Sequence, residues 1–334
     1  NKYINKEFIE KLLIYPYFFD GNICFTNNEN DFFKIKNNLS IDKCIIKTKF
    51  DKTLLIPYTN MLYENSFKFK KYYDSISINK ELDKDSILVV MCLWKRIKYL
   101  NNTLQYLENQ NINKTITLCL WNNNLDNKDK INEMVNELKG KKVKIIIHHS
   151  LENIGGIGRF IFTKYICEQK IHFQNVIFID DDQTFEEDCI GILLNNVKEK
   201  ESYNWSGKKF YKDKGYWNCW SNIWPKLRND IDMTNFDENY LNYGGTGFMI
   251  INTECFLMDE FYQFNEKFKF IEDLWMSYFI INKLGYKLQN GRELKGKVKI
   301  IQGENISSIA QVNLLKPLKD EFLNLLRDEG NWDV

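Results

Sequence analysis

The sequence lacks the features that mark several familiar classes of protein. Its eight cysteines never approach the CxxC spacing of a zinc site, and several lie in apolar runs where a reduced, buried thiol is normal. We therefore expect no structural zinc and a reducing compartment. No apolar run reaches the roughly 18 residues that span a bilayer, and no signal peptide is visible. These absences predict a cytoplasmic protein without a transmembrane segment, peripheral to a membrane at most.

An excess of charge of either sign is also missing. Lysine and arginine number 46 against 45 acidic residues, so no global field would gather nucleic acid. Nucleic acid is therefore not an expected partner, and an anionic ligand would have to be held locally. Aromatic residues, in contrast, are abundant. The 24 Phe, 18 Tyr and 8 Trp suit a large core, a sugar-binding cleft, or both.

An alternation of strands and helices begins near residue 86. The apolar run Ile87–Leu93 predicts a buried strand, and apolar residues then recur at helical spacing at Ile97, Leu100, Leu104 and Leu107. The pattern repeats, with strands expected over 115–121, 143–148 and 175–179 and helices over 129–139, 157–169 and 187–198. This order predicts an α/β fold with a mostly parallel, Rossmann-like sheet covered on both faces by helices. Ligands of such sheets bind beyond the carboxyl ends of the strands.

The rest of the chain does not follow this pattern. Residues 1–84 carry no motif and are expected to form an N-terminal extension or small subdomain. Residues 85–334 are expected to form the main domain, with the strand–helix half at 85–200, an aromatic-rich half at 201–290 and a closing segment at 291–334. Further helices are expected over 272–284 and 317–327. Because no linker separates the halves, both are expected to share one sheet.

The most informative motif is three consecutive carboxylates, Asp180, Asp181 and Asp182, directly after the strand at 175–179. Like charges at this spacing repel, whereas a divalent ion bound by oxygen ligands relieves the repulsion and can also take diphosphate oxygens. A metal-bridged nucleotide is the interpretation we favour, with Asp182 and Asp180 as candidate ligands of Mn²⁺ or Mg²⁺. The plainer alternative is an acidic turn that caps the next helix.

The same carboxylates allow a different enzyme class. With Gln183 and Thr184 they fit the DxDxT pattern of haloacid-dehalogenase-like phosphatases, in which Asp180 would be the phosphorylated nucleophile. That family carries its motif on the first strand of the domain. Three strand–helix units precede the motif here, which disfavours this alternative.

Two further motifs flank the carboxylates in the chain. The segment 152–160 contains Asn153, Gly156 and Arg159, and its glycines allow close backbone approach at the start of a helix, where phosphate or ribose oxygens are favoured. Glu272 and Asp273 begin a later helix, where they either complement the helix dipole or supply a base for an acceptor hydroxyl. Asp273 is the expected base, with Glu272 beside it.

The acceptor is expected to meet aromatic faces and a glycine-rich turn. The candidates for sugar stacking are Trp217, Trp220, Tyr243 and Trp275. Gly244 and Gly245 follow Tyr243 and complete the predicted acceptor segment. Any one of these aromatic residues could instead belong to the core.

Taken together, residues 86–290 resemble the GT-A glycosyltransferases, particularly glycosyltransferase family 2 with its galactofuranosyl- and rhamnosyltransferase-like members. The resemblance implies a nucleotide-sugar donor as co-substrate, a divalent metal, a glycan or other hydroxyl acceptor, and inversion at the anomeric carbon. It assigns Asp180 and Asp182 to the DxD motif and Asp273 to the ED motif. The donor contacts that it implies are Leu93, Arg96, Asn122, Asn123, Asn153, Gly156, Arg159, Asp180 and Asp181.

Two departures from the family pattern concern the donor and the metal. The family usually has an Asp at the end of the second strand, where this chain has asparagines, including Asn122 and Asn123. Some members add a C-terminal His as a metal ligand, but all three histidines here precede the DxD motif. A binding module that holds a nucleotide or glycan without turnover is therefore kept as an alternative beside the phosphatase.

Overall fold

The computed structural model contains two compact units, Asn1–Asn60 and Met61–Val334. The residues that it describes are 17–19, 22–28, 31–35, 44–47, 53–56, 62–63, 65–78, 81–137, 140–169, 171–212, 214–223, 237–301 and 306–334, with only the backbone in the first unit and over 306–314. In the first unit β1 (Tyr17–Phe19), β2 (Asn22–Asn28) and β3 (Asp31–Ile35) form an antiparallel sheet, and β4 (Cys44–Lys47) pairs with β5 (Thr53–Ile56). The rest of the predicted extension before Met61 lies outside the described residues.

The second unit begins at Met61, earlier than the boundary expected near residue 85. Leu62, Phe67 and Tyr72 are buried in its core, and the ring of Phe67 stacks on that of Phe264 at 5.3 Å. Phe67 lies two residues before the first residue of the short helix α2 (Phe69–Tyr73). These residues therefore belong to the main unit by their packing.

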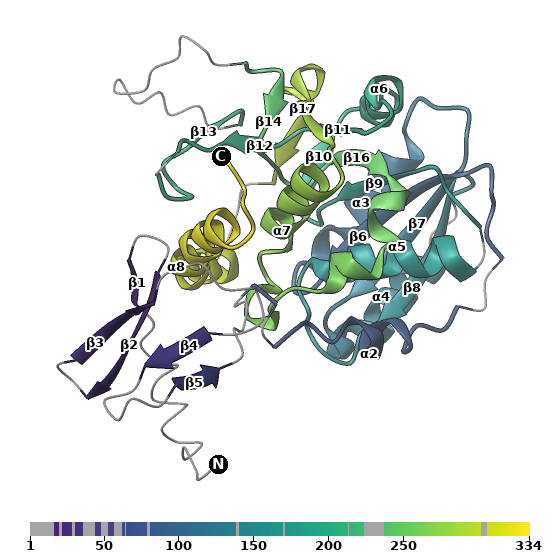
Figure 1. The fold of residues 1–334 in the computed structure, drawn as a ribbon. Helices are drawn as coiled ribbons and strands as arrows, with labels where there is room; N and C mark the ends of the chain where they lie inside the picture. Colours follow the sequence, from purple (N-terminus) through teal and green to yellow (C-terminus); the bar gives the residue numbers. More distant parts are fainter. Residues whose placement is uncertain are drawn as a thin grey trace. The chain divides into compact units, whose positions relative to one another are not determined.

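An eight-stranded sheet organises the second unit (Figure 1). Its strands are β6 (Ile87–Leu93), β7 (Ile116–Asn122), β8 (Val143–His149), β9 (Asn175–Ile179), β11 (Glu201–Asn204), β14 (Tyr240–Leu241), β16 (Met249–Asn252) and β17 (Lys287–Asn290). Their order is β14-β17-β11-β16-β9-β6-β7-β8. β6 pairs in parallel with β7 and β9, and β7 with β8, whereas β16 runs antiparallel to β9 and β11. The predicted α/β class with a mainly parallel sheet is confirmed, and strands on both sides of residue 200 share that sheet.

Helices cover both faces of the sheet, as expected. Besides α2, the α-helices described in this unit are α3 (Leu100–Glu108), α4 (Lys128–Glu137), α5 (Ile157–Gln169), α6 (Cys189–Asn196), α7 (Glu272–Tyr278) and α8 (Ile306–Asp328), of which α8 packs against α7. Short strands complete the unit: β10 (Gln183–Phe185) pairs with β18 (Val298–Ile300), and β12 (Gly207–Lys209) pairs with β13 (Trp220–Ser221) and β15 (Tyr243–Gly244). One-turn helical segments lie at 97–99, 125–127, 253–256, 259–262, 266–268 and 292–294.

Two of the predicted helices differ from the structure. The helix expected over 272–284 is α-helical only to Tyr278 and continues as a π-helical turn over Phe279–Lys283, in which the Leu284 amide donates to the carbonyl of Phe279 at 3.3 Å. The helix expected over 317–327 already begins at Ile306 and contains Pro317. A proline usually marks the first turn of a helix because it lacks an N–H group, and here the helix runs through it.

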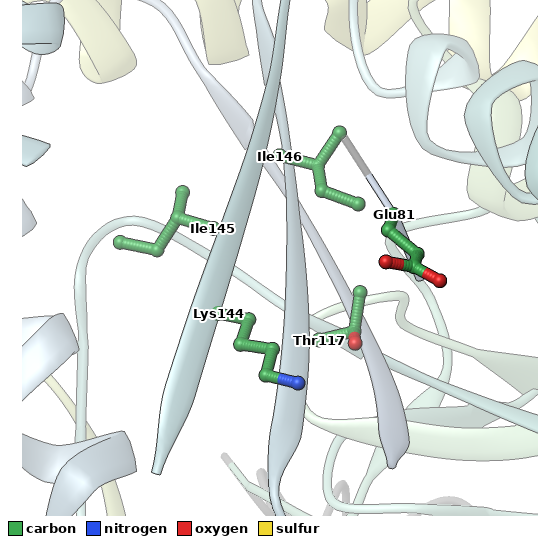
Figure 2. A pocket seen from close by; sticks show the side chains of 5 residues that line it. All are labelled: Glu81, Thr117, Lys144, Ile145 and Ile146. Carbon is green, nitrogen blue, oxygen red and sulfur yellow. The ribbon is translucent and has the colours of Figure 1, made fainter. Parts of the chain in front are cut away.

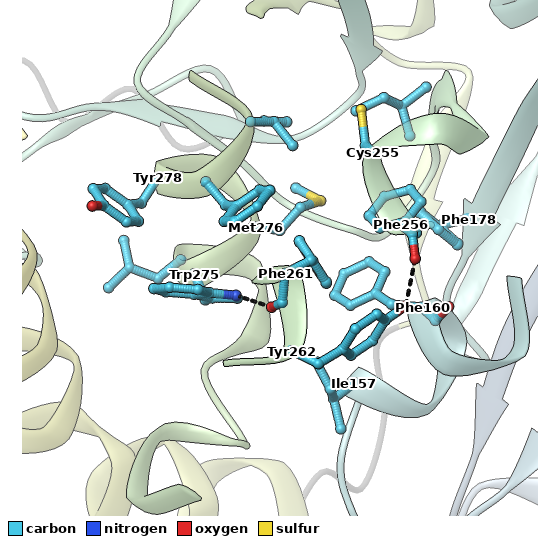
Figure 3. Close-up of a cluster of buried hydrophobic side chains, with 14 of the residues drawn as sticks. Ile157, Phe160, Phe178, Cys255, Phe256, Phe261, Tyr262, Trp275, Met276 and Tyr278 are labelled. Atoms are coloured by element: carbon cyan, nitrogen blue, oxygen red, sulfur yellow. Dashed lines mark hydrogen bonds between the residues drawn. The ribbon is translucent and has the colours of Figure 1, made fainter. Parts of the chain in front are cut away.

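Alternate residues of the strands feed two separate cores. Leu88 and Val90 of β6 pack with α5 and α7, whereas Val89 and Met91 pack with α3 and α6. A strand covered on both faces has no solvent side, which is why β6 is apolar throughout. Figure 3 shows part of the first core, dominated by aromatic side chains.

Two sequence predictions concern cysteines and membranes. All six cysteines whose side chains the structure describes are free thiols. Within the described residues, no helix combines the length and the apolar character needed to cross a membrane.

Candidate active site

A cavity of about 430 Å³ opens at the carboxyl ends of β6 and β9. The connections from β6 lead to β7 and β8 on one side, while β9 lies on its other side, so the cavity occupies the switch point where open α/β sheets bind ligands. We call it the donor pocket. Its lining residues are Cys92, Leu93, Trp94, Arg96, Asn123, Asn153, Gly155, Gly156, Arg159, Asp180, Asp181, Phe270, Glu272 and Leu315.

Another cavity, of about 350 Å³, lies near the amino ends of β7 and β8 and lacks the grouped carboxylates and arginines of the donor pocket. Figure 2 shows its lining, which consists of Glu81, Thr117, Lys144, Ile145 and Ile146. The Thr117 hydroxyl is hydrogen bonded to that of Ser86 at 2.6 Å, and the Lys144 ammonium to Asp83 at 3.4 Å. The polar groups of Thr117 and Lys144 are thus already engaged.

The donor pocket brings together residues that the sequence analysis assigned from separate motifs. Those residues are Leu93, Arg96, Asn123, Asn153, Gly156, Arg159, Asp180, Asp181 and Glu272. Phe270 and Leu315 also line the pocket, and the sequence analysis did not assign them. Leu315 comes from α8, whose position no local pattern reveals.

Asparagine side chains hold the glycine loop against the end of β7. The Asn123 amide donates to the carbonyl of Gly155 at 2.9 Å and its oxygen accepts from the Ile154 amide at 3.1 Å. Gly155 has φ +71°, a left-handed conformation that favours glycine. A Cβ on Gly156 would collide with the Glu272 carboxylate. Gly155 therefore needs the backbone freedom of glycine, and the Glu272 carboxylate lies directly over Gly156.

Asn122 does not reach the pocket, contrary to its predicted donor contact. It is fully buried, its amide donates to the carbonyl of Asn124 at 2.7 Å, and its oxygen accepts from the Asn124 amide at 3.0 Å. Its side chain shapes the turn after β7. Asn123 is the asparagine of this pair that lines the pocket.

Two arginines pair with the three aspartates after β9. Arg96 contacts Asp181 at 2.5 Å and also pairs with Asp182, and Arg159 pairs with Asp180 at 2.9 Å. Burial still raises the pKa of Asp181 to about 6 despite Arg96, and burial also raises the pKa of Asp182, with the Asp180 charge adding to the shift. The carboxylates therefore remain short of positive charge.

These carboxylates suit a divalent ion in their chemistry, although the protein atoms form no ready coordination shell. In the part of the chain that the structure describes, no group of three or more His, Cys, Asp or Glu side chains is arranged to hold a metal. Carboxylate oxygens are the ligands that Mg²⁺ and Mn²⁺ prefer. The Asp182 side chain is 17% exposed and one of its oxygens is paired with Arg96, so an ion that binds it must share the carboxylate with that guanidinium or displace it.

Arg159 is buried, and each of its three guanidinium nitrogens donates one hydrogen bond to the protein. Its guanidinium donates to the carbonyl of Thr246 at 3.0 Å and to Asp180 at 2.9 Å, and its Nε donates to the carbonyl of Gly156 at 3.3 Å. It lines the pocket but is only 5% exposed. Its predicted contact with the donor stays a prediction, and its contacts give it a structural role as well.

We expect Arg159→Ala to lower the free energy of unfolding by about 2–4 kcal/mol, because it leaves Asp180 unpaired and partly buried. Urea unfolding measures this, with the exposed Arg292→Ala as a control that should change little. A normally stable Arg159→Ala protein with weakened donor affinity would instead assign the side chain to donor binding alone.

The two carboxylates at the start of α7 face different surroundings. Glu272 lines the donor pocket beside Arg159. Asp273 accepts a hydrogen bond from the Tyr243 hydroxyl, and burial together with the Asp273 charge raises the pKa of Tyr243 far above its usual value. Adjacent residues of a helix point in different directions. Glu272 thus faces the donor side and Asp273 the side of the predicted acceptor.

Burial raises the pKa of Glu272 to about 7, with the Asp273 charge adding to the shift and Arg159 opposing it. The folded chain thus keeps a proton that the unfolded chain releases near pH 4.5, so this group costs stability as pH rises from about 5 to 8. We expect the free energy of unfolding of Glu272→Gln, relative to that of the native chain, to increase by roughly 2 kcal/mol between pH 5 and pH 8. Urea unfolding at both pH values, with the exposed Glu260→Gln as control, measures it. A constant difference between the two proteins would contradict this result.

Most of the predicted acceptor residues are buried. Trp275 is 1% exposed, and its indole donates to the carbonyl of Phe261 at 2.6 Å (Figure 3), so it has no open face on which a sugar could stack. Trp220 and Tyr243 are 7% and 6% exposed. Trp217, at 37%, offers an accessible ring. The aromatic patterns could not distinguish these cases because core and binding faces use the same residue types.

The predicted glycines of the acceptor segment serve close packing. A Cβ on Gly244 would collide with the Asn204 amide, and one on Gly245 with the Ser206 hydroxyl. The Gly244 amide donates to the Ser277 hydroxyl of α7 at 3.0 Å. These contacts bring β15, and with it Tyr243, against the helix that carries Asp273.

Comparison with known proteins finds similarity in structure alone. No family model matches the chain, and no curated protein matches it. TarS (residues 1–349) from S. aureus is similar, with a TM-score of 0.39, 16% identity, and coverage of 61% of this chain and 57% of that one. The mannosyltransferase PcManGT from Pyrobaculum calidifontis, in complex with GDP-Man and Mn²⁺, is similar with a TM-score of 0.42, 9% identity, and coverage of 66% of this chain and 59% of that one. GalNAc-T7 with UDP, GalNAc and Mn²⁺ is similar with a TM-score of 0.42, 15% identity, and coverage of 61% of this chain and 41% of that one.

The matched region spans less than two thirds of each of these structures. Overlap of this extent concerns the backbone only, so the function argued next depends on the residues of this chain.

Proposed function

We propose that this protein is a divalent-metal-dependent glycosyltransferase of the GT-A type, which moves a sugar from a nucleotide diphosphate to an acceptor hydroxyl with inversion. The observation that carries the proposal is the make-up of the donor pocket. Carboxylates after β9, a glycine loop before α5 and the Glu272 carboxylate of α7 all meet at the switch point of the sheet. Each alone has a structural explanation, but their convergence at one cavity suits a nucleotide sugar.

The nucleotide is proposed to lie over the ends of β6 and β7. Trp94 offers apolar surface, and Asn123 offers polar groups beside it. The diphosphate would lie between the start of α5, whose free amides favour anions, and the aspartates after β9. A divalent ion held by Asp182 and Asp180 would neutralise charge on the leaving diphosphate.

Asp273 is the proposed base. The acceptor O–H bond breaks as its proton passes to the Asp273 carboxylate, the acceptor oxygen bonds to the anomeric carbon, and the bond from that carbon to the diphosphate breaks with its electron pair leaving on phosphate oxygen. The Tyr243 hydroxyl orients the carboxylate through its hydrogen bond. Glu272 faces the donor pocket from the other side of the helix start and is proposed to contact the donor sugar.

A thermal-shift panel of nucleotide sugars, with and without Mn²⁺ or Mg²⁺, tests this function. Binding to the folded chain raises the unfolding temperature with ligand concentration, and we expect one donor class to stabilise the protein only with the ion. Release of inorganic phosphate from phosphomonoesters without nucleotide-sugar binding would assign the protein to the phosphatases. Donor binding without transfer or hydrolysis, over a broad acceptor set, would make it a binding module.

A further inference from the structure

A cluster of lysines and aromatic rings borders the proposed acceptor side. The lysine–tryptophan patch consists of Lys208, Tyr216, Trp217, Lys316 and Lys319. The Lys208 ammonium lies 3.7 Å from the ring centre of Tyr216 and 4.9 Å from that of Trp217. Lys319 lies 4.9 Å and 5.8 Å from the same two rings, and Lys316 lies 5.9 Å from Trp217. Three positive charges therefore surround one accessible indole.

Lys208 and Lys316 have no carboxylate partner among the described side chains, in contrast to Arg96 and Arg159. Lys319 differs: burial lowers its pKa, but the charges of Tyr216, Asp273 and Glu272 raise it above its usual value. The closest carboxylate in sequence is Asp320, whose Oδ1 accepts from the Tyr216 amide at 2.6 Å. Lys319 also donates to the Tyr216 hydroxyl at 3.4 Å. Ring contacts can hold ammonium groups in place, but they leave the net positive charge available to an anion.

Aromatic contacts connect the patch to the proposed base. The Trp217 ring lies 5.1 Å from that of Tyr216, which lies 5.7 Å from that of Tyr243, the hydrogen-bond donor to Asp273. Helix α8 carries Lys316 and Lys319 and also supplies Leu315 to the donor pocket. An acceptor that rests on Trp217 would thus extend toward Asp273.

We propose that the lysine–tryptophan patch binds an anionic acceptor, a sugar that stacks on Trp217 and carries a phosphate held by the lysines. This inference rests on the proposed function and specifies its acceptor class. The separate ammonium groups of Lys208 and Lys316 suit a dianionic phosphate, whereas a carboxylate is better matched by the bidentate fork of arginine. Stacking supplies the preference for a sugar ring over a free anion.

Titration of the full chain with sugar phosphates tests the proposal. The probes are the 6-phosphates of glucose, mannose and galactose, and each is compared with its neutral parent sugar and with inorganic phosphate. Tryptophan fluorescence reports binding, and the Trp217→Phe variant shows which part of the signal comes from Trp217. We expect at least one 6-phosphate to bind more tightly than both its parent and inorganic phosphate. Lys208→Gln and Lys316→Gln should each weaken it about 3- to 10-fold, and the exposed Lys295→Gln should not.

Several results would overturn this inference. They are equal binding of phosphorylated and neutral sugars, equal binding of inorganic phosphate, no binding of any 6-phosphate, or no effect of the Lys208 and Lys316 changes. Loss of binding to vesicles of anionic phospholipid in the same variants, without an effect on sugar phosphates, would assign the patch to a membrane surface. The donor thermal shift is measured beside each titration. Its absence would count against the proposed function itself, whereas its persistence confines a failure to the acceptor class.

Discussion

Replacement of Asp182 by alanine is expected to weaken nucleotide-sugar binding in the presence of Mn²⁺ by about 100-fold or more, to the level of the native chain in excess chelator. The physical reason is charge: a diphosphate beside Asp180, Asp181 and Asp182 is repelled unless a cation intervenes. The fold should remain intact because Asp182 follows the end of β9 and leaves Asp181 paired with Arg96. Calorimetric titration with and without chelator measures the effect.

The control is Asp188→Ala, an exposed carboxylate that pairs with Lys297 at 2.7 Å outside the pocket and should leave donor binding unchanged. Native donor affinity that is insensitive to chelator would contradict metal dependence altogether.

Arg96→Gln should act in the opposite direction to Asp182→Ala on metal binding. Arg96 pairs with both Asp181 and Asp182, so it competes with a divalent ion for the same oxygens. We expect the variant to bind Mn²⁺ alone more tightly than the native chain, as measured by electron paramagnetic resonance of free Mn²⁺. Weaker Mn²⁺ binding in the variant would show that Arg96 organises the carboxylates for the ion and does not compete with it.

Asp273→Asn is expected to slow sugar transfer by roughly 10²–10⁴-fold, the usual contribution of positioned proton transfer. The amide oxygen can still accept the Tyr243 hydrogen bond, and asparagine begins a helix nearly as well as aspartate, so donor affinity and stability should stay near native. The measurement pairs nucleotide-sugar affinity with product formation, using an acceptor of the class proposed above.

Two companion variants separate the roles around this residue. Tyr243→Phe keeps the ring but removes the hydroxyl that contacts Asp273, so transfer should slow less than in Asp273→Asn. Glu272→Gln should be milder still for the chemical step, because Glu272 lines the donor pocket. Near-native transfer by Asp273→Asn would refute the base assignment, and a severe loss in Glu272→Gln alone would move the role to its neighbour.

Local pattern sufficed for the sheet and its helices. The strands over Ile87–Leu93 and Asn175–Ile179 and the helix over Ile157–Gln169 match their predicted limits, because apolar periodicity reports which faces a segment buries. Alternation of the two element types then requires a parallel sheet. The chemistry after β9 was also readable, since three adjacent carboxylates are costly in any fold.

Tertiary structure decided which side chains face the pocket. Trp217 and Trp275 are the same residue type in aromatic surroundings, yet one is 37% exposed and the other 1%. Exposure depends on what packs across from a residue, and that partner is distant in sequence. The same limit hid the pairing of Arg96 with Asp181 and Asp182.

The sequence by itself determined the α/β class, the strand that ends in three aspartates, and the motifs that suggest a nucleotide-sugar site, because each depends on residues close together in the chain. Only the tertiary structure decided that Glu272 faces the donor pocket while Asp273 meets Tyr243, and that α8 brings Leu315 to that pocket and Lys319 to Tyr216. Those contacts join elements that are far apart in the sequence. They depend on long-range packing, which the periodicity of a local segment does not report.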